Sequence, residues 1–136
     1  MPAIKLYSPN DMPKPRSTYS HVAEVGAGSR LIFIAGQVPI DMSGKPVGVG
    51  DLDRQCQQVF AHLETALRAA GAGWKNVVQF LNILVRREDI PKFSAFRERE
   101  MPKLFPDGAY PPSTLIVISA LAHEAFLVEV QVVAAI

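Results

Sequence analysis

The amino-acid sequence predicts a single α+β domain over residues 1–136, in which two helices pack on one face of a mixed β-sheet. Three observations lead to this prediction: a capped helical pattern after Asp51, a buried apolar run over Val77–Val85, and strict alternation over Phe126–Ala134. A chain of 136 residues has the ordinary length of one domain. Hydrophobic residues make up 49% and charged residues 20%, so the chain can bury a core.

The N-terminal stretch, residues 1–17, is predicted to be an extended lead-in with at most one edge strand. Its four prolines restrict the backbone and remove amide donors, which disfavours regular structure. Two apolar stretches follow, His21–Val25 and Leu31–Val38, and Gly26-Ala27-Gly28 separates them. A glycine-containing turn between two such stretches is typical of a hairpin, so we expect these two strands to pair with each other.

The next predicted element is a helix between Asp51 and Gly71. Asp51 is placed to cap its first turn, and Gly71 to end it in a left-handed conformation. The apolar positions step by three and four residues: Leu52, Cys56, Val59, Phe60, Leu63, Ala66, Leu67 and Ala70. The start signal, the periodicity and the stop signal therefore predict the same helix.

The remaining elements complete a β/β/α/β/α/β/β order. The nine-residue apolar run Val77–Val85 predicts a strand that is buried on both faces. Pro91 is suited to the first turn of a second helix, which is expected to end near Leu104. The stretches Thr114–Ser119 and Phe126–Ala134 are predicted to be the last two strands.

The predicted sheet has a second face that two helices cannot cover. In the last strand, Glu129 and Gln131 share one face with Leu127 and Val133, while the alternate residues are all apolar. The run Val77–Val85 is apolar toward both sides. Because burial contributes ~25 cal/mol per Å² of apolar area, leaving this face exposed is costly. We therefore expect another copy of the chain to cover it.

Composition argues against a nucleic-acid partner. The formal net charge is +1, and the largest basic cluster is the pair Arg86-Arg87. A protein that binds a phosphate backbone needs a stronger basic surface. Arg97 and Arg99 lie on the second predicted helix, where arginines are most often solvated; any of these four arginines could also anchor a carboxylate, and nothing in the sequence singles one out. The lone Cys56 falls on the apolar face of the first helix, which predicts an inert buried thiol.

The sequence predicts a cytoplasmic protein without a metal or cofactor. A single cysteine cannot form an internal disulfide, which favours a reducing compartment. The N-terminus lacks the apolar core of a signal peptide, and no apolar run approaches the length of a membrane span. His21, His62 and His123 fall on different elements with no cysteine or carboxylate at ligand spacing, so no metal site is expected.

Six short motifs occur along the chain in the same order as in a known protein family. They are Thr18-Tyr19-Ser20, Ile34 to Pro39, Asp53-Arg54-Gln55, Ala69 to Ala72, Tyr110 to Thr114, and Leu127 to Val130. With these motifs the chain resembles the RidA (YjgF) family, also labelled L-PSP endoribonucleases, from about residue 18 to residue 134. The resemblance implies a chorismate-mutase-like subunit of the bacillus type, a homotrimer, and three clefts between neighbouring subunits.

The resemblance also implies residue roles in the cleft. Glu129 matches a glutamate that orients the water attacking the C=N carbon of an imine. Ser113 stands where active relatives carry an arginine that grips the substrate carboxylate, which predicts weak activity on small 2-imino acids. The substrate-binding positions carried over are Tyr19, Ala35, Gly36, Ser94, Ser113 and Thr114. Ala35 replaces a serine of the family motif, and Ser94 replaces an asparagine.

Two functions remain open at this stage. The first is hydrolysis of an enamine or imine to a carbonyl compound and ammonia, with Glu129 orienting water. The second is binding of a small metabolite in the same clefts without turnover, which loss of the arginine would permit. Glu129 could instead be a structural carboxylate at a subunit interface, and Tyr19 could be an aromatic ring that only packs against its neighbours. Ribonuclease activity is less favoured, because the chain is near neutral and lacks an acid/base histidine pair.

Overall fold

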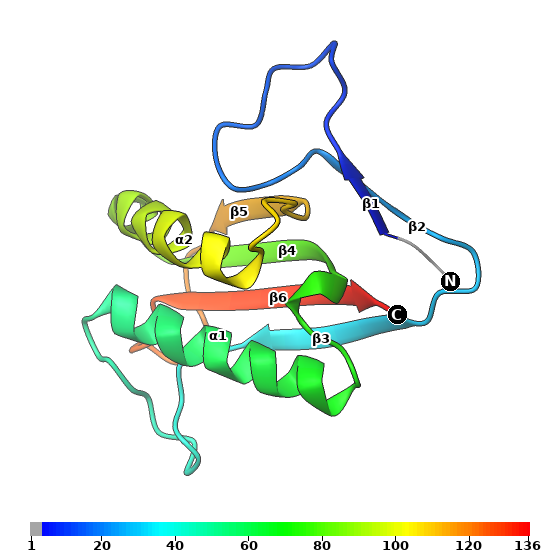
Figure 1. The fold of residues 1–136 in the computed structure, drawn as a ribbon. Helices are drawn as coiled ribbons and strands as arrows, with labels where there is room; N and C mark the ends of the chain where they lie inside the picture. Colours follow the sequence, from blue (N-terminus) through cyan, green and yellow to red (C-terminus); the bar gives the residue numbers. More distant parts are fainter. Residues whose placement is uncertain (1–3) are drawn as a thin grey trace.

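The computed structural model describes residues 4–136, which form β-strands and two α-helices (Figure 1). In order, they are β1 (Ile4–Tyr7), β2 (Val22–Val25), β3 (Leu31–Gln37), α1 (Leu52–Ala69), β4 (Val77–Leu84), α2 (Ile90–Leu104), β5 (Ser113–Val117) and β6 (Val128–Ala135). Short 3₁₀ turns precede β4 and α2.

Four strands form one mixed sheet in the order β3-β6-β4-β5. Strand β6 runs antiparallel to both β3 and β4, and β5 runs parallel to β4. Both helices lie on the same face of this sheet, α1 beside β3 and β6 and α2 toward β5 (Figure 1). The predicted α+β class and the placement of the helices are therefore confirmed.

The predicted hairpin between His21–Val25 and Leu31–Val38, which correspond to β2 and β3, is wrong. Strand β2 pairs antiparallel with β1, in a separate two-stranded sheet, and β3 pairs with β6. Backbone hydrogen bonds between Arg30 and Ile136 lengthen the second pairing. A glycine-containing turn indicates where the chain changes direction, but it does not decide which strands become neighbours. The lead-in thus contains a strand at Ile4–Tyr7, and residues 1–3 lie outside the described part.

The two helices begin and end as the sequence predicts. Asp51 Oδ1 accepts a hydrogen bond from the Arg54 amide at 3.1 Å, which caps α1. Gly71 follows the helix with a φ of 78°, a left-handed conformation that glycine adopts without steric cost. Pro91 lies in the first turn of α2, where its missing amide proton leaves no hydrogen bond unmade.

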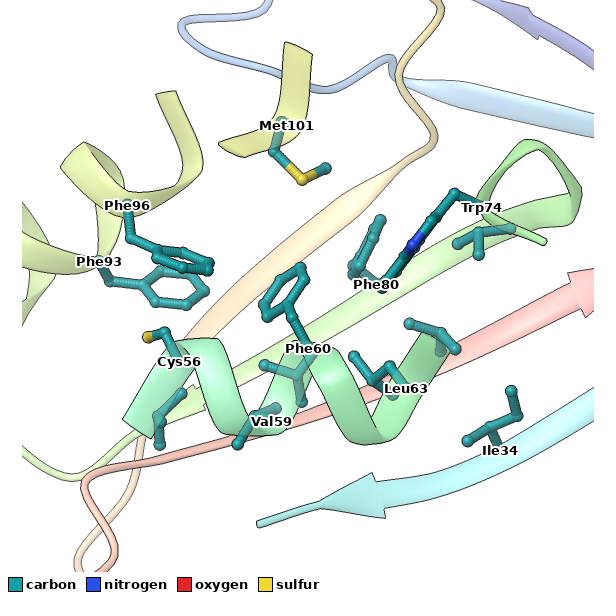
Figure 2. Close-up of a cluster of buried hydrophobic side chains, with 14 of the residues drawn as sticks. Ile34, Cys56, Val59, Phe60, Leu63, Trp74, Phe80, Phe93, Phe96 and Met101 are labelled. Carbon is teal, nitrogen blue, oxygen red and sulfur yellow. The ribbon is translucent and has the colours of Figure 1, made fainter. Parts of the chain in front are cut away.

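The core lies between the helices and the sheet and is rich in aromatic side chains (Figure 2). Phe60 of α1 occupies its centre, stacked on Trp74 and Phe80 at centroid distances of 5.7 and 6.2 Å. It also contacts Phe96 of α2 at 5.0 Å. Cys56 is fully buried, and this burial raises the pKa of its thiol to about 12. The predicted burial of this thiol is thus confirmed.

One buried polar side chain joins α1 to two loops. Gln55 is fully buried, and its amide nitrogen donates to the carbonyl oxygens of Gly48 at 3.2 Å and Ala125 at 2.8 Å. Its side-chain oxygen accepts from the Leu127 amide at 2.8 Å. Leu127 immediately precedes β6, so this contact holds the start of that strand against α1.

We predict that Gln55→Met destabilises the fold while keeping side-chain volume. The substitution leaves the half-buried carbonyl groups of Gly48 and Ala125 and the buried amide of Leu127 without their partner. We expect the free energy of unfolding to fall by roughly 2–5 kcal/mol, because an unsatisfied buried group costs about 1–3 kcal/mol and the two half-buried carbonyl groups, which water can reach in part, cost less. Chemical denaturation measures this, and Gln57→Met on the exposed side of α1 is the control. Equal stabilities of the two variants would contradict the role of Gln55.

Candidate functional site

Three of the predicted site residues line one small cavity. Tyr19 from the segment between β1 and β2, Ser94 from α2 and Ser113 at the start of β5 meet around a space of about 190 Å³. Two residues not predicted from the sequence, Asn82 and Arg97, line the same cavity. It is smaller than the roughly 300–1,000 Å³ of pockets that enclose drug-sized ligands. The cavity therefore suits a small molecule or forms one part of a larger site.

Arg97 is the residue that sequence reasoning misjudged. Only 7% of its surface is exposed, so the expectation of a solvated arginine is wrong. The signal that could have identified it is its position, because Arg97 follows Phe93 by four residues and Phe96 by one on the buried stripe of α2. An arginine on the apolar face of a helix needs a specific partner or function.

The guanidinium of Arg97 is held by polar contacts and by an aromatic ring. It donates to the Thr18 carbonyl oxygen at 3.0 Å and to Asn82 Oδ1 at 3.4 Å. Its central carbon lies 5.2 Å from the centroid of the Phe80 ring, a cation–π distance. Burial lowers the pKa of Arg97 to about 10, so the side chain stays positively charged at pH 7.

Asn82 connects Arg97 to Ser113. Its Nδ2 donates to Ser113 Oγ at 2.8 Å and to the Thr114 carbonyl oxygen at 3.0 Å, while its Oδ1 faces the guanidinium. Asn82 is only 1% exposed, which fixes this arrangement. Since Ser113 Oγ accepts from Asn82, its own hydroxyl proton remains available to a ligand in the cavity.

Glu129 and Gly36 form a second cluster. Glu129 lies on β6, and its carboxylate packs over the backbone of Gly36 on β3: a Cβ added to Gly36 would lie only 2.7 Å from the Glu129 carboxyl carbon. The absence of a side chain at Gly36 thus makes room for the carboxylate. Neighbouring Ala35 is exposed.

The two clusters lie on opposite faces of the sheet. Ser113 pairs in register with Phe80, whose side chain points into the core, so Ser113 faces the helix side. Glu129 alternates with the buried Val128 and Val130 and therefore faces the open side. Thr114, adjacent to Ser113, also faces the open side, where it lines a hollow of about 300 Å³. One subunit therefore does not bring Glu129 and Ser113 together.

The other candidate sites among residues 4–136 contain none of the predicted site residues. A cavity of about 320 Å³ lies between β1 and the segment after α2, but none of the predicted site residues lines it. Among residues 4–136, no cluster of three or more His, Cys, Asp or Glu side chains is arranged to hold a metal ion. Within the same residues, neither helix has the length and apolar character needed to cross a membrane.

Sequence comparisons identify relatives over nearly the whole chain. Residues 9–136 match the family model described as Endoribonuclease L-PSP. A RutC family protein of Pyrococcus horikoshii is 30% identical over 118 residues, which cover 82% of this chain and 91% of the relative. The mouse protein named 2-iminobutanoate/2-iminopropanoate deaminase is 27% identical over 130 residues, covering 96% of this chain and 90% of the relative.

Solved structures agree with these relatives. The Rid family protein YyfB of Yersinia pestis, described as a protein of unknown function, matches with a TM-score of 0.86 at 29% identity over 98% of each chain. Yeast Mmf1 matches with a TM-score of 0.66 at 20% identity over 97% of this chain and 98% of its own, which shows the shared fold. The chain therefore belongs to the Endoribonuclease L-PSP family, to which its Rid and RutC relatives point.

Proposed function

We propose that the protein is a homotrimeric hydrolase of small enamines or imines, with its active cleft between neighbouring subunits. The observation that carries this proposal is the separation of the two clusters, Tyr19-Ser94-Ser113 on one face of the sheet and Glu129-Gly36 on the other. A second copy of the chain is the simplest way to bring one cluster of each kind into a single cleft.

The open face of the sheet supports assembly. Phe33 on β3 is 74% exposed and Leu31 is 50% exposed, and Ile116 on β5 is also exposed. Large apolar side chains exposed on both edge strands of one sheet face favour an interaction site there, because their contact with water is unfavourable. Glu129 and Thr114 face the same side. A neighbouring subunit that covers this face would therefore border both of these residues.

The proposed chemistry assigns one role to each cluster. Glu129 would orient a water molecule so that its oxygen attacks the electrophilic carbon of the C=N bond. The nitrogen takes up protons and leaves as ammonia, while the carbon becomes a carbonyl. Tyr19, Ser94 and Ser113 would hold the substrate from the other side through ring contact and hydroxyl groups. The named activity of the mouse relative is of this reaction class.

Binding without turnover is the second candidate function, and one observation favours it. The residue that occupies the arginine position of active relatives is Ser113, and its hydroxyl already accepts a hydrogen bond from buried Asn82. A cleft altered in this way can retain a ligand without catalysing its hydrolysis. In either case we propose a cytoplasmic location, since the only cysteine is a buried free thiol.

We predict that the protein runs near three times its chain mass of 14.9 kDa in light scattering. Phe33→Glu should dissociate it, because a charge on the apolar face is costly to bury. Met42→Glu, at an exposed loop position, is the matched control and should leave the mass unchanged. A monomeric mass of the unmodified protein at micromolar concentration would remove both the trimer and the shared cleft.

We predict that Glu129→Gln abolishes most turnover while the trimer stays folded. The amide keeps the shape but cannot act as a base, so the rate of ammonia release from freshly generated 2-aminoacrylate should fall by about 10²–10⁴-fold. Glu124→Gln, an exposed change of the same kind, is the control. If the unmodified protein binds 2-oxobutanoate but releases no ammonia above the uncatalysed rate, the binding function replaces the hydrolase.

We predict that Gly36→Ala has the same functional effect as removing the Glu129 charge. The added Cβ would overlap the carboxylate and displace it from its position. Ammonia release and ligand affinity should both fall, with little change in far-UV circular dichroism. Gly73→Ala is the control, because a Cβ there has no heavy atom within 4 Å. Unchanged activity of the Gly36 variant would mean that the observed position of Glu129 is not the functional one.

A further inference from the structure

Arg97 carries a buried positive charge without a negative partner. No carboxylate of residues 4–136 forms an ion pair with it, although six such pairs occur elsewhere in this part of the chain. Burying an ion is costly unless an opposite charge or a full set of hydrogen bonds compensates. A buried arginine in this state is therefore expected to meet an anion that comes from outside the chain.

The cavity offers unused hydrogen-bonding capacity beside this charge. Two N–H groups of Arg97 donate to Thr18 O and Asn82 Oδ1, and the others have no acceptor among residues 4–136. The hydroxyl of Thr18, which also lines the cavity, is buried and has no hydrogen-bond partner in the same range. Since buried polar groups are normally satisfied, the Thr18 hydroxyl indicates a missing polar ligand, and the remaining N–H groups of Arg97 can donate to the same ligand.

We propose that Arg97 is the residue that binds the carboxylate of a small ligand, in place of the arginine that Ser113 replaces. Both side chains line the same cavity, and Asn82 hydrogen-bonds to each of them. The cation has thus moved from the start of β5 to the facing helix α2. This inference rests on the proposed small-molecule site, and it names the anchor and the charge of the ligand.

A monocarboxylate fits the cavity better than a phosphate ester. The cavity is about 190 Å³, which limits the ligand to a few heavy atoms. Among residues 4–136, Arg97 is the only charged side chain that lines it, so one negative charge of a ligand is compensated and two are not. A carboxylate also accepts two parallel hydrogen bonds from the guanidinium fork. The hydroxyls of Tyr19 and Ser94 remain for the polar end of the ligand.

The guanidinium is oriented before any ligand arrives. Phe80 lies against its face, and Thr18 O and Asn82 Oδ1 hold two of its N–H groups. A cation fixed in this way loses little freedom on binding, which favours affinity. Lysine could supply the charge but not the planar fork, so Arg97→Lys should weaken carboxylate binding without removing it.

The experiment compares a charged ligand with an uncharged one of the same shape. Pyruvate and pyruvamide are titrated into the unmodified protein, Arg97→Gln, Arg97→Lys and the control Arg99→Gln, an exposed arginine two residues away. We expect the unmodified protein and Arg99→Gln to prefer pyruvate by at least tenfold. Arg97→Gln should lose this preference, and Arg97→Lys should keep part of it. Inorganic phosphate should compete more weakly than pyruvate.

The preference for pyruvate over pyruvamide shows whether Arg97 binds the carboxylate or has only a structural role. If Arg97 only tied Thr18 to α2, its loss would weaken both ligands equally and leave their ratio unchanged, which would overturn the proposal. If Arg97→Gln does not fold, a crystal of the unmodified protein soaked with pyruvate decides the question. A carboxylate within hydrogen-bonding distance of Arg97 supports the proposal, and a carboxylate elsewhere or no bound pyruvate overturns it.

The outcomes also separate this inference from the proposed activity. If the unmodified protein hydrolyses 2-iminobutanoate and Arg97→Gln leaves both kcat and KM unchanged, the hydrolase stands and the role of Arg97 fails. If no turnover occurs but the preference for pyruvate depends on Arg97, the hydrolase fails and the carboxylate anchor stands.

Discussion

Helices cover only one face of the β3-β6-β4-β5 sheet, and most other features of the molecule follow from this constraint. Because β6 is central, its alternate residues divide between the two sides: Val128 and Val130 complete the aromatic core, while Glu129 points away from it. The covered side supplies the packing energy that folds the chain. The open side retains the exposed Phe33 and Glu129, so the proposed assembly and the proposed catalysis depend on the same surface.

The covered side is not purely hydrophobic. Asn82 and Arg97 are buried among aromatic rings, where they contribute less to stability than apolar residues of similar size would. Their hydrogen bonds join α2, β4, the start of β5 and the segment between β1 and β2 at Thr18. Such a network persists when it serves a purpose beyond packing. A cavity bordered by both side chains is consistent with ligand recognition as that purpose.

The arginine that Ser113 replaces and the buried Arg97 are related in space, because Ser113 and Arg97 line the same cavity. Ser113 is too short and too weakly polar to replace a guanidinium, yet the structure places a guanidinium across the same cavity. A cation contributed by a helix approaches the ligand from a different direction than one at a strand end. Retaining Glu129 over Gly36 while moving the positive charge would therefore alter which ligands fit, without changing the fold.

The sequence by itself determined the elements whose signals are local. Asp51 and Gly71 bound α1 and Pro91 starts α2, because caps and periodicity act over a few residues. The fold class was indicated by the resemblance, which the order of six short motifs along the chain carried. Only the tertiary structure decided that β2 pairs with β1, and that Arg97 is buried rather than solvated. Strand pairing and burial depend on segments that are distant along the chain, and no local pattern encodes which of them will meet.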